Sequence, residues 1–545
     1  MNTFSGNIVD VVSGEIYAGT IKVSGGKIKE IAREAKKYKN FLIPGFIDAH
    51  IHIESSMLPP AEFARAAVRH GTVGAVADAH EIANVLGIAG VRYMIDHAKK
   101  VPFRFYFSAP SCVPATTFET SGAALHPSDI EKLFRSDEIK FLGEVMNYPG
   151  VINGDPEVME KIALAKKYGK LVDGHAPGLR GEPLRKYVAA GISTDHECFR
   201  RDEALEKLSL GMKVIIREGS AVKNFDELIP IANEHSENCM LCSDDKHPDD
   251  LAESHINALV KRAITAGIPV MKVLRMASLN PVRHYGLDVG LLQKGDNADF
   301  LEIDNLEKLN ILQTIIGGRV VARKGRTLLS RKPAKKVNDM RSATISAKSL
   351  VVRHTTEKSG NIRVIVAENG SLITKKMTTP AKISNGEIIP DVPGDILKLV
   401  IVNRYRSAPP AIAFIHNFGL KKGAIASSVA HDSHNIIAVG TNDGDLADAI
   451  NLLFKNKGGV CAVSRVNRKK EVLPLPIAGL MSTDPFDKVA KKYEKIDKLA
   501  KKFGSKLTAP FMTLSFMALL VIPELKLSDK GLFDGTTFTF ADTEV

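Results

Sequence analysis

The sequence predicts an α/β protein built around a (β/α)8 barrel, with a small discontinuous β domain and a C-terminal α/β domain. Three observations lead to this fold class. At 545 residues, the chain is too long for a single hydrophobic core. Over residues 43–285, eight apolar segments alternate with helical stretches, which is typical of a barrel. Short strands and turns replace this alternation on both sides of the barrel region.

The small β domain is predicted from two separate segments. Residues 1–42 contain short strand-like runs such as Asn7–Val12 and Thr20–Val23, separated by glycine-containing turns. Residues 286–330 return to the same pattern, with a turn at Gly317-Gly318. We therefore expect residues 1–42 and 286–330 to form one domain, with the barrel inserted between them.

The barrel strands are predicted where apolar runs end in polar residues. In a (β/α)8 barrel, catalytic side chains come from the C-terminal ends of the strands. Polar residues from distant parts of the chain should therefore converge there. The predicted strands are Phe41–His50, Thr72–His80, Phe103–Ser111, Ile139–Asn147, Lys170–His175, Ile192–Glu197, Lys213–Arg217 and Asn238–Ser243.

A charged linker over residues 331–336 precedes the third domain, which is predicted for residues 340–545. Strands are expected at Ile362–Ala367 and Leu397–Val402. Helices are expected at Gly444–Phe454 and Phe486–Lys502. This mixture predicts an α/β domain.

Composition limits the partners and the compartment. The net charge is +12, but the basic clusters carry no interleaved aromatic residues, which favours a solvated surface over a nucleic-acid interface. The five cysteines form no evenly spaced framework, which favours a reducing compartment. The longest apolar run, Phe511–Ile522, is too short to span a bilayer. We expect a cytoplasmic protein with no nucleic-acid or membrane partner.

The first predicted barrel strand ends in two histidines. His50 and His52 stand two residues apart, and alternate side chains of a strand point to the same face. The two rings can therefore bind one metal ion. Further polar residues follow the other strands: Asp78, His80, Glu81, Glu144, His175, Asp195, His196, Glu197, Asp244 and Asp245. Mixed nitrogen and oxygen ligands suit divalent Mn, Fe or Zn.

Two such metals close together imply hydrolytic chemistry. They would share a water and lower its pKa enough to supply hydroxide near neutral pH. An aspartate at the end of the last strand could accept a proton from this hydroxide and return it to a leaving nitrogen. Asp244 is the candidate for this role.

The motifs resemble the amidohydrolase superfamily and, within it, the adenine deaminase family. The run from Pro44 to His52 and the pair Ser243-Asp244 carry the first resemblance. The second extends over nearly the whole chain. It rests on Ile53–Met57, Asp78–Val85, Gly143–Asn147, Asp173–Pro177, Ala430–Asn435 and Leu475–Ser482.

The resemblance implies hydrolysis of adenine to hypoxanthine and ammonia, a reaction of purine salvage, at a binuclear Mn²⁺ or Fe²⁺ centre. Many superfamily members bridge their metals with a carbamylated lysine on strand four. This chain has Glu144 there, whereas Lys140 lies at the opposite end of that strand. A homo-oligomer, a dimer, is also expected. The implied ligands are His50 and His52 for the first metal, His175 and His196 for the second, Glu144 for both, and Asp244 for the first.

The implied mechanism has hydroxide attack C6 of adenine while Asp244 moves the proton. Glu54 and Glu81 would contact purine ring nitrogens or orient histidines, and His80 would contribute at the strand end. A polar loop that contains Asp432, Ser433 and His434 either caps a helix or closes over the barrel to line the substrate pocket.

Two other function classes stay open from the residues. The first is a binuclear hydrolase that opens a cyclic amide, although its pocket would generally accompany the lysine bridge. The second is a basic nucleic-acid-binding protein on an inactive barrel, against which the complete ligand set argues. A substrate panel separates the first alternative from adenine deamination, and a steep salt dependence would mark the second.

Overall fold

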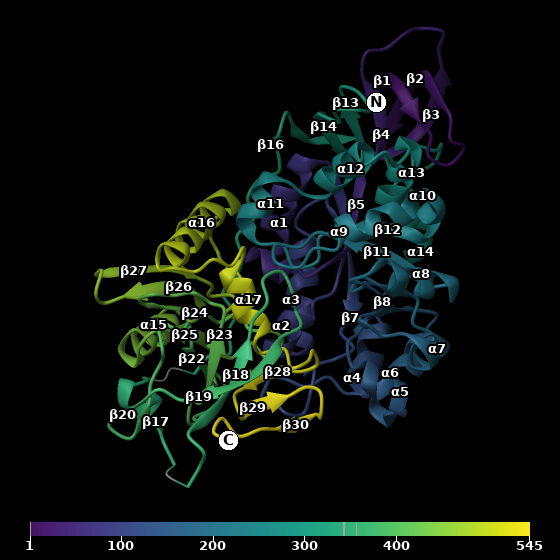
Figure 1. Cartoon of the computed structure of the whole chain (residues 1–545). Coiled ribbons are helices and arrows are strands. Elements are labelled where there is room, and N and C mark those ends of the chain that lie inside the picture. Colours follow the sequence, from purple (N-terminus) through teal and green to yellow (C-terminus); the bar gives the residue numbers. More distant parts are fainter. Residues whose placement is uncertain (1, 342–343, 356) are drawn as a thin grey trace.

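The computed structural model describes residues 2–341, 344–355 and 357–545. Figure 1 shows three regions: a small sheet beside the N-terminus at the top, the barrel below it, and a C-terminal domain at the lower left. Within the described ranges, none of the helices combines the length and the apolar character that a bilayer crossing requires.

The small sheet joins chain segments from both sides of the barrel. Its eight strands lie in the order β16-β15-β14-β13-β4-β1-β2-β3, and β4 pairs with β1 on one side and β13 on the other. The chain leaves this sheet, forms the barrel, and returns. The strands are β1 (Asn2–Val9), β2 (Ile16–Ser24), β3 (Lys27–Arg33), β4 (Phe41–Pro44), β13 (Phe300–Ile303), β14 (Ile311–Ile316), β15 (Arg319–Arg323) and β16 (Arg326–Thr327).

The prediction of one continuous strand over Phe41–His50 is wrong. The structure has β4 in the small sheet and a separate strand β5 (Phe46–Ile51) in the barrel, with Gly45 between them. A Cβ atom on Gly45 would lie 2.3 Å from a methyl group of Val73, so only glycine fits this close approach. The break depends on packing against a later strand, which a local pattern does not contain.

The predicted fold class is confirmed, because eight parallel strands wind into a barrel. Strands β5 to β9 form one sheet and β10 to β12 another. Single bridges between Val172 and Ile192 and between Ile51 and Asp244 connect the two sheets at both junctions. The later strands are β6 (Thr72–Ala77), β7 (Arg104–Ala109), β8 (Ile139–Val145), β9 (Leu171–Gly174), β10 (Thr194–Asp195), β11 (Lys213–Arg217) and β12 (Cys239–Cys242).

Helices surround these strands, and one of them begins at a predicted site residue. Helix α2 (His80–Leu86) starts three residues after β6 ends, so His80 lies on a helix and not on the strand. The other helices of this region are α1 (Pro60–Ala67), α3 (Ile88–Ala98), α4 (Pro127–Phe134), α5 (Tyr148–Asn153), α6 (Pro156–Lys167), α7 (Gly181–Ala189), α8 (Arg201–Ser209), α9 (Phe225–Leu228), α10 (Ala232–His235), α11 (Pro248–Glu253), α12 (Ile256–Thr265), α13 (Val270–Leu274) and α14 (Asn280–Tyr285).

The C-terminal domain is built on an eight-stranded sheet in the order β19-β18-β23-β22-β25-β24-β26-β27. Helix α15 (Asp443–Lys455) covers one face, and the Asn442 side chain caps it by accepting the N–H of Asp445. The sheet strands are β18 (Asn361–Val366), β19 (Lys375–Pro380), β22 (Leu397–Val402), β23 (Ala411–His416), β24 (Ala424–Ser427), β25 (Ile436–Gly440), β26 (Gly459–Ser464) and β27 (Lys469–Pro474).

Smaller elements complete this domain. Helix α16 (Phe486–Lys502) buries its apolar side and exposes most of its lysines. Helix α17 (Pro510–Phe516) is buried along its whole length. One small sheet contains β17 (Val352–Arg353), β20 (Ile383–Ser384) and β21 (Glu387–Ile388). A second contains β28 (Leu525–Ser528), β29 (Gly531–Asp534) and β30 (Thr539–Phe540).

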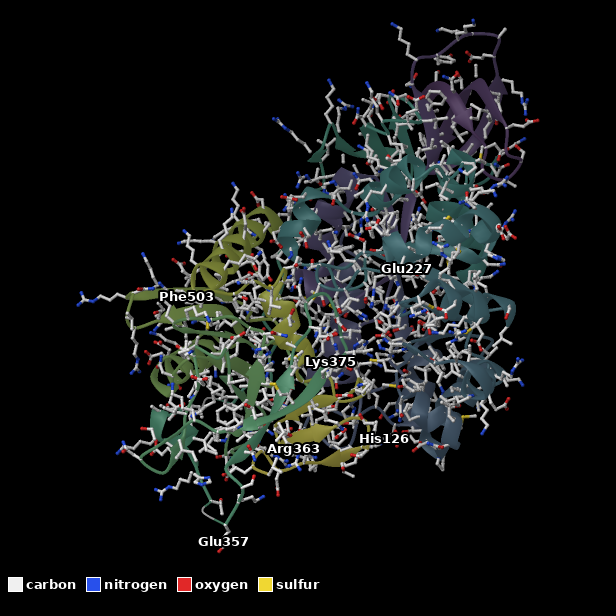
Figure 2. The ribbon with its side chains drawn as sticks, viewed as in Figure 1. His126, Glu227, Glu357, Arg363, Lys375 and Phe503 are labelled. Atoms are coloured by element: carbon white, nitrogen blue, oxygen red, sulfur yellow. The ribbon has the colours of Figure 1, made fainter. Side chains whose placement is uncertain are left out.

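The C-terminal domain packs closely on the barrel. One apolar core extends through both parts and includes Ile82 of the barrel and Phe516 of α17. The backbone N–H of Ser482 donates to the carbonyl of Met57 at 2.8 Å. The predicted charged linker also contacts the barrel, since the Tyr93 hydroxyl donates to the carbonyl of Lys335 at 2.9 Å. With side chains drawn, the space between the ribbons is filled (Figure 2).

Candidate active site

The first pair of histidines lies at the end of β5. The Nε2 atoms of His50 and His52 are 3.1 Å apart, and both side chains are buried. A shared proton or a shared cation is needed to keep two imidazole nitrogens this close, because two lone pairs repel. The two rings therefore present nitrogen atoms to one point at the mouth of the barrel.

Glu144, at the end of β8, lies between two pairs of histidines. One carboxylate oxygen is 3.3 Å from Nε2 of His52. The other is 2.8 Å from Nδ1 of His175 and 3.0 Å from Nε2 of His196. Burial alone would raise the pKa of Glu144, but the neighbouring histidines hold it well below its usual value. Lys140 is exposed, away from this cluster.

A glycine and an aspartate set the position of Glu144. The Asp78 carboxylate accepts the backbone N–H of Glu144 at 2.9 Å and the hydroxyl of Ser108 at 2.7 Å. A Cβ atom on Gly143 would lie 2.2 Å from the Asp78 carboxylate, so this approach requires glycine. Asp78 therefore holds the strand end on which Glu144 stands.

Asp244 completes the cluster from the end of β12. Its Oδ1 atom is 3.2 Å from Nε2 of His52 and 3.6 Å from Nε2 of His50. Its backbone is left-handed, with φ of 51°, an uncommon conformation that aspartate tolerates better than most residues. Asp245 also lies near His52 and Asp244, and it accepts the hydroxyl of Ser55 at 2.5 Å.

Arg217 is a site residue that the sequence analysis missed. It is buried at the end of β11, where it donates to Oδ2 of Asp244 at 2.5 Å and to Oε2 of Glu197 at 2.8 Å. Burial alone would raise the pKa of Asp244, but the guanidinium holds it well below its usual value. The sequence did contain a signal for this role, because Arg217 is a charged residue at the end of a predicted barrel strand.

The donor set fits divalent cations. Groups formed by His50, His52 and Glu144 and by Glu144, His175 and His196 each offer ligand atoms within 4.8 Å of one another, all buried. Buried polar atoms normally have hydrogen-bond partners. Here Nδ1 of His50, Nε2 of His175 and both ring nitrogens of His196 have none among the described residues. Cations would supply favourable contacts to such a cluster of nitrogens and carboxylates.

The C-terminal domain contributes histidines that bind Glu81. Nε2 of His431 is 2.8 Å from one Glu81 oxygen, and Nε2 of His434 contacts the other. Nδ1 of His434 accepts the backbone N–H of Ala430 at 3.2 Å, so a neutral His434 carries its proton on Nε2, the atom that faces Glu81. Glu81 is also 3.4 Å from Nε2 of His80. Glu81 therefore lies within ion-pair distance of three histidines, but neither of its oxygens has a hydrogen-bond partner among the described residues.

A small cavity lies between the metal-ligand candidates and the C-terminal domain. Glu81, His80 and Asp432 line it from the polar side, and Asp245 and His431 are also in its wall. Leu372, Phe516 and Leu519 of the C-terminal domain supply an apolar wall. Burial raises the pKa of Asp432 to about 6, and its Oδ2 atom has no hydrogen-bond partner among the described residues.

Three predicted substrate contacts lie outside this lining. Glu54 is buried behind the cavity and accepts the backbone N–H of Ile82 at 3.2 Å. His434 binds Glu81, as described above. The Ser433 hydroxyl donates to the Glu119 carboxylate, which comes from the loop between β7 and α4. Of the predicted polar loop, only Asp432 faces the cavity together with His431.

Replacement of Glu119 by Gln should change how stability depends on pH. Burial raises the pKa of Glu119 from 4.5 to about 8, so the folded protein binds a proton that the unfolded chain releases. Stability contributed by this proton is therefore present at low pH and is lost as pH rises from about 4.5 to 8. At pH 9 the loss is on the order of 5 kcal/mol.

The Glu119→Gln variant cannot lose this proton. We expect its Tm to equal that of the wild type at pH 5 and to exceed it at pH 9. A thermal melt at both pH values checks this difference. Equal melting temperatures at pH 9 would contradict a protonated Glu119.

The barrel and this cluster define an amidohydrolase. Membership of this class implies a divalent metal centre. Residues 41–321 match the amidohydrolase family, and residues 371–539 match the adenine deaminase C-terminal domain. The chain belongs to the adenine deaminase family.

Three relatives carry the name adenine deaminase. The protein from Sulfurovum sp. is 53% identical over 538 residues, which cover 98% of each chain. The protein from Methanosarcina mazei is 50% identical over 552 residues, which cover 99% of each chain. The protein from Salinibacter ruber is 51% identical over 542 residues, which cover 99% of this chain and 98% of the relative.

Proposed function

We propose that this protein catalyses the hydrolytic deamination of free adenine to hypoxanthine and ammonia. The observation that carries the proposal is the buried Glu144 carboxylate, which contacts both histidine pairs beside a cavity closed by the C-terminal domain. Full-length relatives named adenine deaminase support adenine as the substrate. The domain that lines the cavity is the one that matches the adenine deaminase C-terminal domain.

The proposed cofactor is a pair of divalent cations, Mn²⁺ in the first place and Fe²⁺ as the alternative. His50, His52 and Asp244 would hold the first cation, His175 and His196 the second, and Glu144 would contact both. When bound, such a pair lowers the pKa of a shared water, so that hydroxide is available near neutral pH.

Asp244 is the proposed proton carrier. Arg217 engages Oδ2, which leaves Oδ1 facing the histidines and able to accept a proton. Its low pKa keeps the carboxylate ionised before the reaction. It would take a proton from the attacking water and return it to the ring nitrogen or the departing amine. The pairing with Arg217 fixes the orientation of the carboxylate throughout.

The residues that line the cavity have the remaining proposed roles. Leu372, Phe516 and Leu519 exclude water and offer an apolar surface to a flat base. Asp432, with its unpartnered oxygen, is the proposed hydrogen-bond partner for a purine edge. Glu81 and His80 contact each other. We propose that they orient neighbouring side chains at the polar side of the cavity.

We also propose a cytoplasmic location. The five cysteines are free and buried in the described chain, which supports a reducing compartment. A homodimer and the lack of a nucleic-acid partner stay predictions from the sequence.

The test is a substrate panel on protein purified with Mn²⁺ supplied and iron limited. We expect turnover of adenine, followed by absorbance and by ammonia release, and none of adenosine, cytosine, guanine or a hydantoin. Chelation should abolish the activity and Mn²⁺ should restore it, because the bound cations lower the pKa of the attacking water. Hydrolysis of the hydantoin with no turnover of adenine would retain the metals but overturn the substrate.

A further inference from the structure

Lys526 is a fully buried lysine on β28. Its ammonium group donates to two backbone carbonyls, of Leu372 at 2.6 Å and of Phe516 at 3.0 Å. Among the residues that the structure describes, no carboxylate pairs with it, and burial lowers its pKa to about 7. A buried amine without a counter-ion is costly, so its two hydrogen bonds are the contacts that favour a lysine here.

The carbonyl of Phe516 accepts two hydrogen bonds, one from Lys526 and one from the backbone N–H of Leu519 at 3.2 Å. Phe516 is the last residue of helix α17, and the final carbonyls of a helix have no partner within it. The next carbonyl, of Met517, accepts the backbone N–H of Leu527 at 2.9 Å. Strand β28 therefore satisfies the end of α17 with one backbone group and one lysine side chain.

The carbonyl of Leu372 belongs to the connection between β18 and β19. Two residues further on, the Thr374 hydroxyl donates to the carbonyl of Leu525 at 2.8 Å. Strand β28 thus anchors this connection at neighbouring positions. The Lys526 side chain ties the connection and the end of α17 together.

Both residues that Lys526 holds face the cavity. Leu372 and Phe516 line it together with Leu519, opposite the cluster of His52 and Glu144. The Phe516 ring also lies 5.1 Å from the ring of His431, which contacts Glu81. A shift of either backbone segment would therefore move the wall of the cavity relative to the reacting groups.

We propose that Lys526 is a positioning residue that fixes the apolar wall on which the flat face of the substrate packs. This inference rests on the proposed function, since the substrate is adenine. Lys526 touches neither the cavity nor the metal-ligand candidates. Its effect should appear in the affinity for the base, with little change in metal content.

The test compares Lys526→Met with Lys398→Met. Methionine fills similar space without donating. Lys398, on β22, is equally buried, and it donates to the Leu350 carbonyl at 2.8 Å and to Asp443 at 2.6 Å, outside the cavity lining. We expect Lys526→Met to raise KM for adenine and the inhibition constant of hypoxanthine about ten-fold or more, because small misplacements at a site are costly. The change in kcat should be smaller.

The control variant should lose thermal stability without a change in KM. Lys526→Arg retains two donors and should restore KM toward the wild-type value. Lys526→Met with a wild-type KM and inhibition constant would overturn the proposal. If Lys526→Met does not fold, Phe516→Ala tests the same wall, and an unchanged KM there would overturn it as well.

The two proposals fail in different ways. A wild-type enzyme that is silent on adenine overturns the proposed function before any variant is measured. A wild-type enzyme that deaminates adenine, together with a Lys526→Met variant of normal affinity, overturns only the role of Lys526.

Discussion

Replacement of Glu144 by Gln is expected to lower kcat/KM for adenine by at least about a thousand-fold, at the upper end of what one preorganised charged group supplies. The Glu144 carboxylate contacts His52, His175 and His196, so its removal affects both histidine pairs at once. Glutamine keeps the shape but carries no charge and presents an N–H₂ group to one of them. The variant should also bind less than the wild-type amount of metal.

Metal analysis of the purified variant, beside the adenine assay, measures both effects. Glu119→Gln is the matched control, because Glu119 is also a buried carboxylate but lies outside the ligand cluster. It should retain full metal content. A Glu144→Gln variant with wild-type metal content and activity within ten-fold would contradict a carboxylate that contacts both cations.

The convergence of the site could be predicted because it depends on two simple geometries. Alternate residues of a strand share a face, which places His50 beside His52. The C-terminal ends of parallel strands meet on one side of a barrel, which brings Glu144 to His175 and His196. Neither relation requires knowledge of how the side chains pack. The strand positions in the sequence were therefore sufficient to predict that these side chains converge.

Other features depend on contacts between distant segments, and local patterns do not contain them. The break at Gly45 follows from the approach of Val73. Ser433 meets Glu119 across 314 residues of sequence. The polar loop was expected either to cap a helix or to line the pocket, and its motif does not reveal that His434 turns toward Glu81. Such pairings are set by the docking of the C-terminal domain on the barrel.

Replacement of Asp244 by Asn should lower kcat by roughly 10²–10⁴-fold, the range of a lost general acid–base group. Asparagine preserves the size of the side chain and can still present an oxygen to His52, but it cannot carry a proton. Arg217 would lose its charged partner on this side, although Glu197 still neutralises it. KM for adenine should change less than kcat, since Asp244 acts on the proton and not on the base.

Asp245→Asn is the matched control for this prediction, because Asp245 is the next residue and also lines the cavity. Its carboxylate accepts from Ser55 and lies 3.5 Å from His431, and one of its oxygens lies within 4.8 Å of a ring nitrogen of His52. We expect less than about a ten-fold change in kcat, since neutralising a hydrogen-bonded carboxylate outside the reaction costs little in rate. Arg217 pairs with Asp244 and not with Asp245. If Asp245→Asn nevertheless reduced kcat as strongly as Asp244→Asn, the role of proton carrier could no longer be assigned to Asp244.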